Sequence, residues 1–210
     1  MRPLILVGGG GHCKSVIDVA EQAGFEIHGI LDLPENIGES ILNYSIIGAD
    51  DKIIDYVNDY DFVVTVGQIK NPDLRKRIHR KILEAGGQLR TVISPKSHVS
   101  NYSKIEDGTV VLHNSVINAD ATIGFGCIIN TLSNVEHDVT IGDYCHISTG
   151  AMVNGGCIIG NDCFIGSQSV LTHGVEIVDG CIISAGSFLH KSVVIRGVYF
   201  GNPAKLIKRL

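Results

Sequence analysis

A fixed six-residue repeat decides the fold of the second half of the chain. Residues 141–169 read IGDYCHISTGAMVNGGCIIGNDCFIGSQS, with an aliphatic residue at every sixth position from Ile141 to Ile165. The same spacing holds without interruption for sixteen positions from Val99 to Leu189, and a small or β-branched residue follows each of them four positions later. A helix would repeat about every 3.6 residues and a paired strand about every two, whereas a constant longer period is typical of a solenoid.

This repeat predicts a triangular coil in which each six-residue unit forms one short side. The aliphatic residues fill the interior and the small residues fit the turns. Three units, or 18 residues, close one coil, and successive coils hydrogen-bond at a spacing of roughly 4.8 Å. Five of the six cysteines occupy the small position, so we interpret them as packing residues rather than metal ligands or redox thiols. They are Cys127, Cys145, Cys157, Cys163 and Cys181.

The residues before the repeat follow a different pattern, in which short apolar strands alternate with helices. We expect strands at 4–7, 27–31, 62–66 and 89–93, a first helix that ends near Gly24, and a basic amphipathic helix over 71–84. The second helix would begin with Asn71 as its cap and would bury Leu74, Ile78 and Ile82. Such alternation predicts a small parallel α/β sheet that binds ligands at the carboxyl ends of its strands.

A glycine turn follows the first of these strands, and Asp32 follows the second. The turn reads Gly8-Gly9-Gly10-Gly11-His12, and its backbone amides at a helix N-terminus favour a phosphate group. The dinucleotide fingerprint is incomplete because Cys13 stands where the third glycine belongs, so NAD is not expected. A tight turn that binds no ligand is the alternative interpretation.

Composition argues against two classes of partner. The 17 basic and 22 acidic residues give a net charge of -5 without a basic block, so nucleic acid is not expected. The apolar run at the start is too short for a signal peptide, and no run is long enough to span a membrane. We therefore expect a cytoplasmic protein without membrane insertion.

The repeat resembles that of the hexapeptide acyltransferases, in which Gly or an acidic residue follows the aliphatic position. Ile123–Cys127, Ile141–Cys145, Ile159–Cys163 and Ile165–Ser169 match this pattern, and residues 201–205 resemble the segment that follows the repeats in many such enzymes. The resemblance implies a left-handed parallel β-helix, a homotrimer, and active sites between neighbouring β-helices.

A histidine and two carboxylates occupy one corner of the predicted coil, in Glu136-His137-Asp138. A neutral imidazole can remove the proton from an amine or hydroxyl that attacks a thioester, and an adjacent carboxylate can orient that imidazole. One coil further on lie Gly155 and Gly156, which would leave room for a pantetheine arm. Because the repeat cysteines are interpreted as packing residues, we expect direct transfer rather than a covalent acyl-enzyme.

Over nearly its full length the chain is similar to bacterial UDP-4-amino-sugar N-acetyltransferases of the bacillosamine type, and to acetyltransferases encoded in sialic and legionaminic acid clusters. This resemblance implies a Rossmann-like sugar-nucleotide-binding domain over 1–95 and a left-handed β-helix acyltransferase domain with a C-terminal tail over 96–210. It also implies acetyl-CoA as the donor, no metal, His137 as the general base and Asp138 as the residue that orients it.

The remaining site residues are assigned from the same resemblance. The nucleotide-sugar is expected at Gly9, Gly10, Gly11, His12, Asp32, Gly67, Asn130 and Glu136. Acetyl-CoA is expected at Gly155, Gly156, Gly166, Ser167, Asn202, Pro203, Ala204 and Lys205, and at His146, which would lie near the thioester carbonyl. In two departures, Asp138 replaces a more frequent Glu, and Leu33 replaces the acidic or amide residue that often follows Asp32.

The expected function is acetyl-CoA-dependent N-acetylation of a UDP-linked 4-amino-sugar in bacterial surface-glycan or glycoprotein-sugar biosynthesis. Three alternatives are O-acetylation of a sialic-acid-like sugar by the same base, a non-enzymatic sugar-nucleotide-binding protein, and a zinc protein like the γ-class carbonic anhydrases. The zinc alternative is disfavoured because His137 and His173 are 36 residues apart, which is two coils, or roughly 10 Å.

Overall fold

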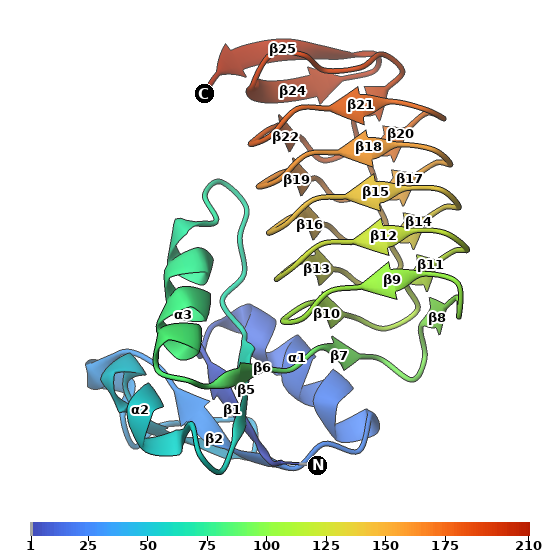
Figure 1. The fold of residues 1–210 in the computed structure, drawn as a ribbon. Coiled ribbons are helices and arrows are strands. Elements are labelled where there is room, and N and C mark those ends of the chain that lie inside the picture. Colours follow the sequence, from blue (N-terminus) through green and yellow to red (C-terminus); the bar gives the residue numbers. More distant parts are fainter. Residues whose placement is uncertain (1) are drawn as a thin grey trace. The chain divides into compact units, whose positions relative to one another are not determined.

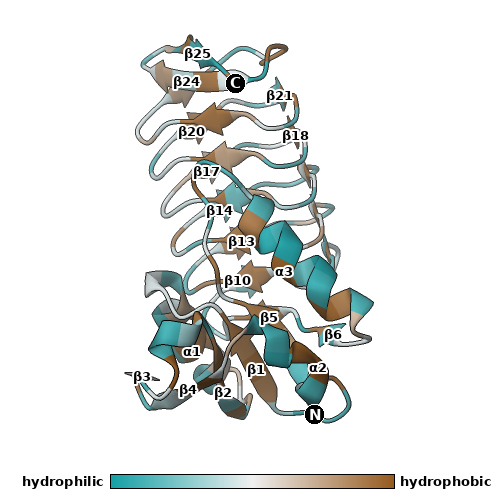
Figure 2. Ribbon diagram, turned by 90° about the vertical axis from the view of Figure 1, so that its left-hand side faces the viewer, coloured by the Kyte–Doolittle hydropathy of each residue, from teal (hydrophilic) through white to brown (hydrophobic). Residues whose placement is uncertain are grey.

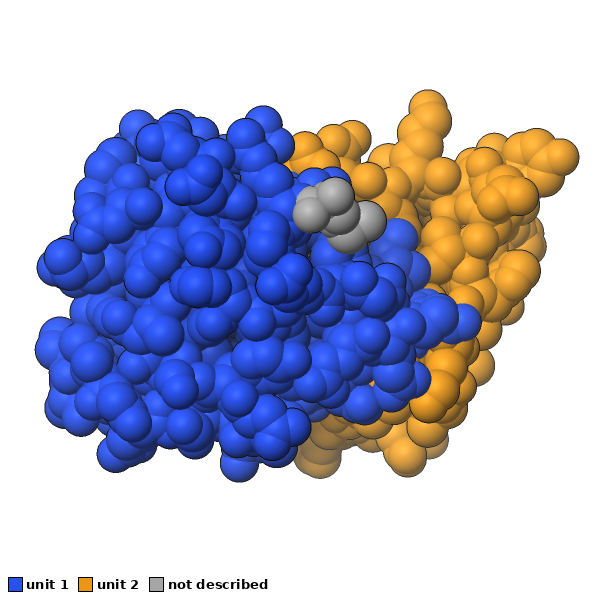
Figure 3. All heavy atoms as spheres, turned by 90° about the horizontal axis from the view of Figure 1, so that it is seen from below, with its two compact units in different colours: residues 1–67, 73–95 blue, residues 68–72, 96–210 orange. Residues whose placement is uncertain are grey.

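Residues 2–210, which the computed structural model describes, fall into two units drawn in separate colours in Figure 3. One unit comprises the residues up to Gly67 together with Asp73–Pro95, and the other comprises Gln68–Pro72 together with Lys96–Leu210. Within the described residues, no helix has both the length and the apolar character needed to cross a membrane.

The first unit is built on a sheet of six strands in the order β3-β4-β2-β1-β5-β6 (Figure 1). Neighbouring strands are parallel except β3 and β4, which form an antiparallel pair. Every residue of β1 is at most 2% exposed, as expected for a central parallel strand. The strands are β1 (Leu4–Val7), β2 (Ile27–Leu31), β3 (Ser40–Ile41), β4 (Tyr44–Gly48), β5 (Asp61–Val64) and β6 (Gln88–Leu89).

Three helices accompany this sheet: α1 (Gly11–Gln22), α2 (Ile53–Tyr56) and α3 (Asp73–Glu84). Two 3-10 turns, η1 (Pro34–Asn36) and η2 (Asp50–Lys52), and a short strand, β7 (Val92–Ile93), complete the unit. The expected burial of Leu74 is wrong, since this side chain is 45% exposed and the neighbouring Arg75 is buried instead. Arg75 Nη1 donates to the carbonyls of Val64, at 2.6 Å, and Val66, at 2.9 Å, so polar bonds to the end of β5 determine which face of α3 is buried.

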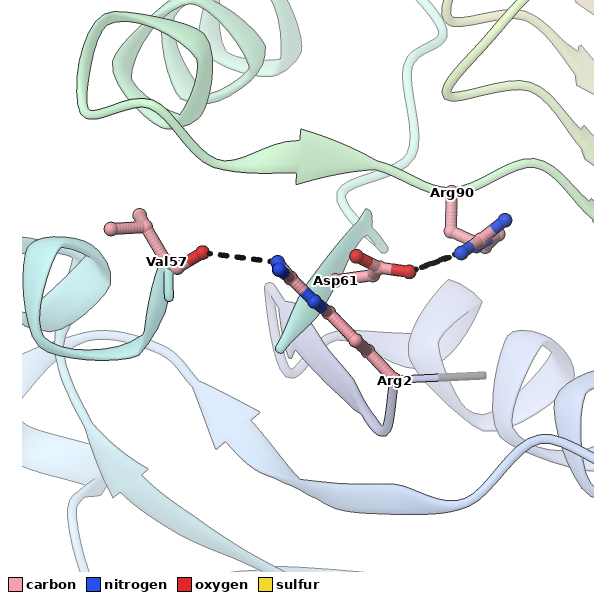
Figure 4. A network of polar contacts seen from close by, with 4 residues as sticks. All are labelled: Arg2, Val57, Asp61 and Arg90. Carbon is pink, nitrogen blue, oxygen red and sulfur yellow. Dashed lines mark hydrogen bonds and ion pairs between the residues drawn. The ribbon is translucent and has the colours of Figure 1, made fainter. Parts of the chain in front are cut away.

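The first residue of β5, Asp61, has a buried carboxylate that is paired with an arginine (Figure 4). Asp61 is 1% exposed, and its Oδ2 accepts hydrogen bonds from both Nε and Nη2 of Arg90. Nearby, Arg2 Nη1 donates to the Val57 carbonyl at 3.5 Å. Because a buried carboxylate is stable only when it is paired, Arg90 fixes the path of the chain after β6.

The second unit is a parallel β-helix whose three sheets form the three sides of each coil (Figure 1). One sheet contains, in order, β25-β24-β22-β19-β16-β13-β10, the second is β23-β20-β17-β14-β11-β8, and the third is β21-β18-β15-β12-β9. Each two-residue strand of the coils pairs with the strand 18 residues away, as in Ile128 with His146 and Ile129 with Ile147. The predicted six-residue units therefore match the observed strands.

The coil strands are two residues long and the two terminal strands are longer. Their bounds are β8 (His98–Val99), β9 (Lys104–Ile105), β10 (Val110–Val111), β11 (Val116–Ile117), β12 (Thr122–Ile123), β13 (Ile128–Ile129), β14 (Asn134–Val135), β15 (Thr140–Ile141), β16 (His146–Ile147), β17 (Met152–Val153), β18 (Ile158–Ile159), β19 (Phe164–Ile165), β20 (Val170–Leu171), β21 (Glu176–Ile177), β22 (Ile182–Ile183), β23 (Phe188–Leu189), β24 (Gly197–Gly201) and β25 (Ala204–Arg209).

In most two-residue strands the second residue is buried in the coil, and first residues such as Ile158 face outward, although the first residues Ile128 and His146 are also buried. Ile147 and Ile159 are at most 1% exposed, whereas Ile158 is 48% exposed. Figure 2 shows this apolar content, with strands such as β13 and β20 in brown. The five repeat cysteines are all fully buried, which agrees with their interpretation as packing residues.

A residue with positive φ recurs at the turns between strands. Glycine occupies some of these positions, such as Gly150 at φ +65°, but Asp138 at +61° and Asp162 at +62° take the same conformation. Aspartate tolerates this region better than most residues because its short side chain can hydrogen-bond locally. The coil geometry thus sets the backbone of Asp138 at the corner that carries His137.

Candidate functional site

His137 lies in the turn between β14 and β15, with 59% of its side chain exposed. Its Nδ1 donates a hydrogen bond to Asp138 Oδ2 over 2.7 Å, so the shorter carboxylate does reach the ring. This hydrogen bond is the main cause that raises the pKa of His137 above its ordinary value. With Nδ1 protonated, the lone pair of neutral imidazole lies on Nε2, which is available to take a proton from a substrate.

Glu136, which precedes His137 in the chain, accepts hydrogen bonds from two asparagine side chains. Asn118 Nδ2 donates to its Oε2 at 2.8 Å, and Asn134 Nδ2 donates to its Oε1 at 2.9 Å. The hydrogen bond from Asn134 is the largest of the effects that lower the pKa of Glu136. Glu136 therefore stays ionised near neutral pH and adds negative charge beside the base. The two asparagines are site residues that sequence reasoning missed; Asn118 lies one coil before Glu136, so the 18-residue step would have found it.

Gly155 lies one coil beyond His137 and leaves space for its ring. A Cβ atom at position 155 would lie 2.7 Å from His137 Cε1 and 2.8 Å from His137 Nε2, which no real Cβ contact tolerates. At Gly156, a Cβ would instead meet His173 Cε1 at 3.5 Å. In this structure both glycines thus lie beside histidine rings, and their expected contact with pantetheine stays a prediction.

His146 forms a second cluster, on strand β16. It is 7% exposed, and its Nδ1 donates to the main-chain carbonyl of Gln68 at 2.6 Å. Asn130 Nδ2 lies 3.0 Å from its Nε2, while the Asn130 amide oxygen accepts from Thr131 N at 2.8 Å. Nδ1 therefore carries the hydrogen that is donated to Gln68, and Nε2 accepts from Asn130, so this arrangement leaves no N–H of His146 for a thioester carbonyl; the expected polarisation of that carbonyl by His146 stays a prediction.

A pocket of about 580 Å³ lies on the same sheet as His146. Phe164, which contacts the His146 ring edge to face at 5.2 Å, forms part of its apolar wall. The complete lining is Ile69, Lys70, Phe164, Ser167, Ile182, Ser184, Ala185, Val198, Lys208 and Leu210. An apolar wall with two lysines suits an extended thioester arm that ends in phosphates.

Two of the residues expected to bind acetyl-CoA are in or beside this pocket. Ser167 is in the lining, and its hydroxyl hydrogen-bonds to that of Ser148 at 2.9 Å. Gly166 precedes it, and a Cβ there would lie 2.4 Å from the Ala185 amide nitrogen. Sequence reasoning missed Phe164, Ile182 and Ala185, although the 18-residue step from His146 and Ser167 reaches all three.

The expected segment Asn202-Pro203-Ala204-Lys205 forms the turn and first part of the β24–β25 hairpin. Its Asn202–Pro203 peptide bond is cis, and Asn202 and Pro203 are exposed. The hairpin contributes Val198 and Lys208 to the pocket, but the four expected residues are not in its lining.

The two histidine clusters lie on different parts of each coil. His137 is at the corner where the side containing β14 meets the side containing β15, while His146 is on the side containing β16. In a triangle, that side is opposite the corner. One copy of the β-helix therefore separates the candidate base from the pocket beside His146.

In the first unit, the expected nucleotide-sugar residues gather where β1, β2 and β5 end. A Cβ at Gly9 would lie 2.4 Å from Asp32 Oδ2, so only glycine permits this close approach. Asp32 Oδ2 accepts a hydrogen bond from Asn36 Nδ2 at 3.0 Å, and Asn36 was not anticipated. A Cβ at Gly67 would meet His12 Cβ at 3.6 Å.

The turn before α1 has the space that a phosphate needs. A Cβ at Gly10 or Gly11 would meet no other atom within 4 Å. Gly10 directly precedes the first residue of α1, so these amides lie at a helix N-terminus. The expected residues Asn130 and Glu136 belong to the second unit, in the clusters described above. Across residues 2–210, no group of three or more His, Cys, Asp or Glu side chains is arranged to hold a metal ion.

Known protein families match the two units of the chain separately. Residues 3–82 match the PglD N-terminal domain. Residues 120–155 match the bacterial transferase hexapeptide of six repeats, and residues 156–191 match the hexapeptide repeat of succinyl-transferase.

Solved structures match nearly the whole chain. The acetyltransferase domain of PglB from Neisseria gonorrhoeae FA1090 is 28% identical, with a TM-score of 0.91 over 99% of this chain and 100% of that one. The same domain is known in complex with acetyl coenzyme A. PerB from Caulobacter crescentus, in complex with CoA and GDP-perosamine, is 28% identical, with a TM-score of 0.90 over 98% of this chain and 97% of that one.

These matches confirm the expected fold, in which a small Rossmann-like domain precedes a left-handed parallel β-helix. WeeI from Acinetobacter baumannii AYE, at 22% identity and a TM-score of 0.88, shares the same fold. The chain thus joins a PglD N-terminal domain to the hexapeptide repeats of bacterial transferases, and it resembles the bacillosamine-type sugar N-acetyltransferases.

Proposed function

We propose that this protein is an acetyl-CoA-dependent N-acetyltransferase that acetylates the amino group of a nucleotide-linked sugar. The observation that carries the proposal is the His137–Asp138 pair, whose 2.7 Å hydrogen bond leaves Nε2 of an exposed imidazole as a proton acceptor. The complexes of related proteins, PglB with acetyl coenzyme A and PerB with CoA and GDP-perosamine, support both substrate classes.

The residues at the corner account for the proton transfer. As the sugar amine attacks the thioester carbonyl, Nε2 of His137 accepts the amine proton, and Asp138 stabilises the imidazolium that forms. The proton then returns to the departing CoA thiolate. No cysteine is placed to act as a nucleophile among residues 2–210, because the five repeat cysteines are fully buried and burial raises the pKa of Cys13 to about 11.

The separation of the two histidine clusters supports a site shared between copies of the chain. We propose a homotrimer in which the His137 corner of one β-helix faces the His146 sheet of the next. The acetyl-CoA arm would then lie in the pocket beside Phe164, with Lys70 and Lys208 available for its phosphates. Gly155 and Gly156 would approach the same arm from the other copy.

For the acceptor, we propose a UDP-linked 4-amino-sugar of a bacterial surface glycan or glycoprotein, with its diphosphate at the glycine turn before α1. The open space at Gly10 and Gly11 supports this placement because the backbone amides there can reach a phosphate. GDP-linked perosamine is the second candidate because PerB binds it. We propose that the enzyme acts in the cytoplasm.

The test is release of free CoA thiol from acetyl-CoA with four acceptors in parallel: a UDP-4-amino-4,6-dideoxy sugar, GDP-perosamine, a free sialic acid, and no acceptor. We expect turnover with one of the nucleotide amino-sugars, and a loss of about two to four orders of magnitude in His137→Ala. Turnover with only the sialic acid would overturn the proposed acceptor. Unchanged turnover in His137→Ala would overturn the proposed base.

A further inference from the structure

Gln68 follows the end of β5 along the chain, but it packs within the β-helix unit. It is 6% exposed. Its main-chain carbonyl accepts from His146 Nδ1 at 2.6 Å, and its side-chain Nε2 donates to the main-chain carbonyl of Tyr144. One residue therefore holds the backbone two positions before His146 as well as the imidazole itself.

The chemistry of these partners fixes the tautomer of His146. A main-chain carbonyl can only accept, so the hydrogen of the neutral imidazole must be on Nδ1. Nε2 then accepts from Asn130 Nδ2 at 3.0 Å, an orientation of the amide that agrees with its oxygen accepting from Thr131 N. Gln68, His146 and Asn130 thus form one chain in which each donor faces an acceptor.

Stability alone does not explain the glutamine side chain at position 68. Its Oε1 is buried and has no hydrogen-bond partner within residues 2–210. A buried acceptor without a donor destabilises a fold, whereas an apolar side chain of similar size would have no such effect. The clamp to Tyr144 therefore indicates a role in arranging the histidine beside the pocket.

We infer that Gln68 is a positioning residue of the acyl-transfer site, which holds His146 in the Nδ1-protonated tautomer against Phe164 at the pocket wall. This inference rests on the proposed function for its catalytic consequence, but the tautomer itself is independent of that function. Gln68 acts through His146 and needs no contact with substrate. Its clamp depends on the amide donor, which a carboxylate or an alkyl group lacks.

The test uses the full-length protein with Gln68→Glu, Gln68→Leu and, as a matched control, Gln22→Ala. Glutamate keeps the shape of glutamine but cannot donate to the Tyr144 carbonyl, and leucine keeps most of the volume without any polar atom. Gln22 also donates through its side chain, to Asp18 at 2.7 Å, but on an exposed helix surface. Thermal unfolding establishes that each variant is folded.

Two measurements are made on each protein. Long-range ¹H–¹⁵N correlation spectra of histidine-labelled protein, with His146 assigned by the loss of its signals in His146→Phe, report the tautomer. We expect Nδ1–H alone in the wild type and in Gln22→Ala. Both Gln68 variants should give a mixture of tautomers, because without the side-chain bond to Tyr144 the main-chain carbonyl of residue 68 is no longer held against Nδ1 of His146. Steady-state kinetics should show kcat/KM for acetyl-CoA falling about tenfold in the Gln68 variants, because a loosened His146 ring no longer supports Phe164 at the pocket wall. KM for the nucleotide-sugar should stay unchanged.

An Nε2–H tautomer of His146 in the wild type would overturn the inference, as would wild-type kcat/KM in folded Gln68→Glu or Gln68→Leu. If the wild type turns over none of the amino-sugars but His146 loses its single tautomer in the variants, the proposed function fails while the positioning of His146 by Gln68 stands. If either variant does not fold, the other variant and the wild-type tautomer decide the outcome.

Discussion

Replacement of Gly155 by alanine tests whether the position of the His137 ring sets the rate of the proposed reaction. The new Cβ would lie 2.7 Å from His137 Cε1, 2.8 Å from Nε2 and 3.3 Å from Nδ1. Gly155 has no positive φ, so alanine fits its backbone conformation, and the three atoms nearest to the new Cβ all belong to the imidazole. The substitution therefore displaces the His137 ring while the residue at position 137 stays a histidine.

The size of the effect follows from these distances. Carbon atoms in contact are normally about 3.5–4.0 Å apart, so the ring must move by roughly 1 Å. A displacement of about 1 Å at a reacting group costs on the order of a hundredfold in rate. Because the imidazole is largely exposed, it can move outward, and we expect the unfolding temperature to stay close to that of the wild type.

The assay is a double-mutant cycle on kcat/KM with Gly155→Ala, His137→Ala and the double variant. Alanine at position 155 should lower kcat/KM about a hundredfold when His137 is present and have almost no effect when it is absent. An equal loss in both backgrounds would show that alanine blocks the donor or distorts the coil, and would refute the reasoning from the ring contact.

Three further predictions concern the pH dependence, the core and the pocket. The hydrogen bond to Asp138 raises the pKa of His137, so kcat/KM should rise with pH as the imidazole loses its proton. In a pH–rate profile, Asp138→Ala should move this rise to lower pH and lower the plateau. An unmoved midpoint would argue against the pair. Ile159→Ala should lower the free energy of unfolding in urea by about 2–5 kcal/mol, against less than about 1 kcal/mol for the outward Ile158→Ala; equal losses would contradict the assigned interior. Ala185→Trp should fill the pocket and weaken acetyl-CoA binding at least about tenfold by calorimetry, without affecting nucleotide-sugar binding; unchanged acetyl-CoA affinity would place the donor elsewhere.

The β-helix could be predicted in detail because its signal is local and strictly periodic. The six-residue repeat places Ile147 in the coil interior and His146 on the outer side of its strand. Three repeats make one coil, so the repeat also gives the pairing of each coil with the next. The pairing of His137 with Asp138 was expected from the family resemblance, and the structure shows that the shorter carboxylate reaches the ring. Even the contact between Gly155 and His137 follows from an 18-residue step.

Contacts between distant segments had no such signal. Gln68 and His146 are 78 residues apart in the chain, and no repeat relates them. The buried face of α3 was misassigned because an amphipathic pattern counts Leu74 as apolar and Arg75 as polar, whereas two carbonyls at the end of β5 satisfy the buried guanidinium. The β3–β4 hairpin escaped notice because its turn uses Leu42 at φ +51° rather than glycine.

The regular stacking of the coils also sets the distance between residues on one sheet of the β-helix. From β16, which carries His146, the chain of paired strands passes through β19 and β22 to β24, whose hairpin carries Lys208. Three such steps span roughly 14 Å. An insertion of one whole coil would lengthen this interval by one step while leaving every interior side chain in register, and a shorter insertion would break the register. In the proposed complex with acetyl-CoA, the length of the thioester substrate between His146 and Lys208 is thus counted in whole coils.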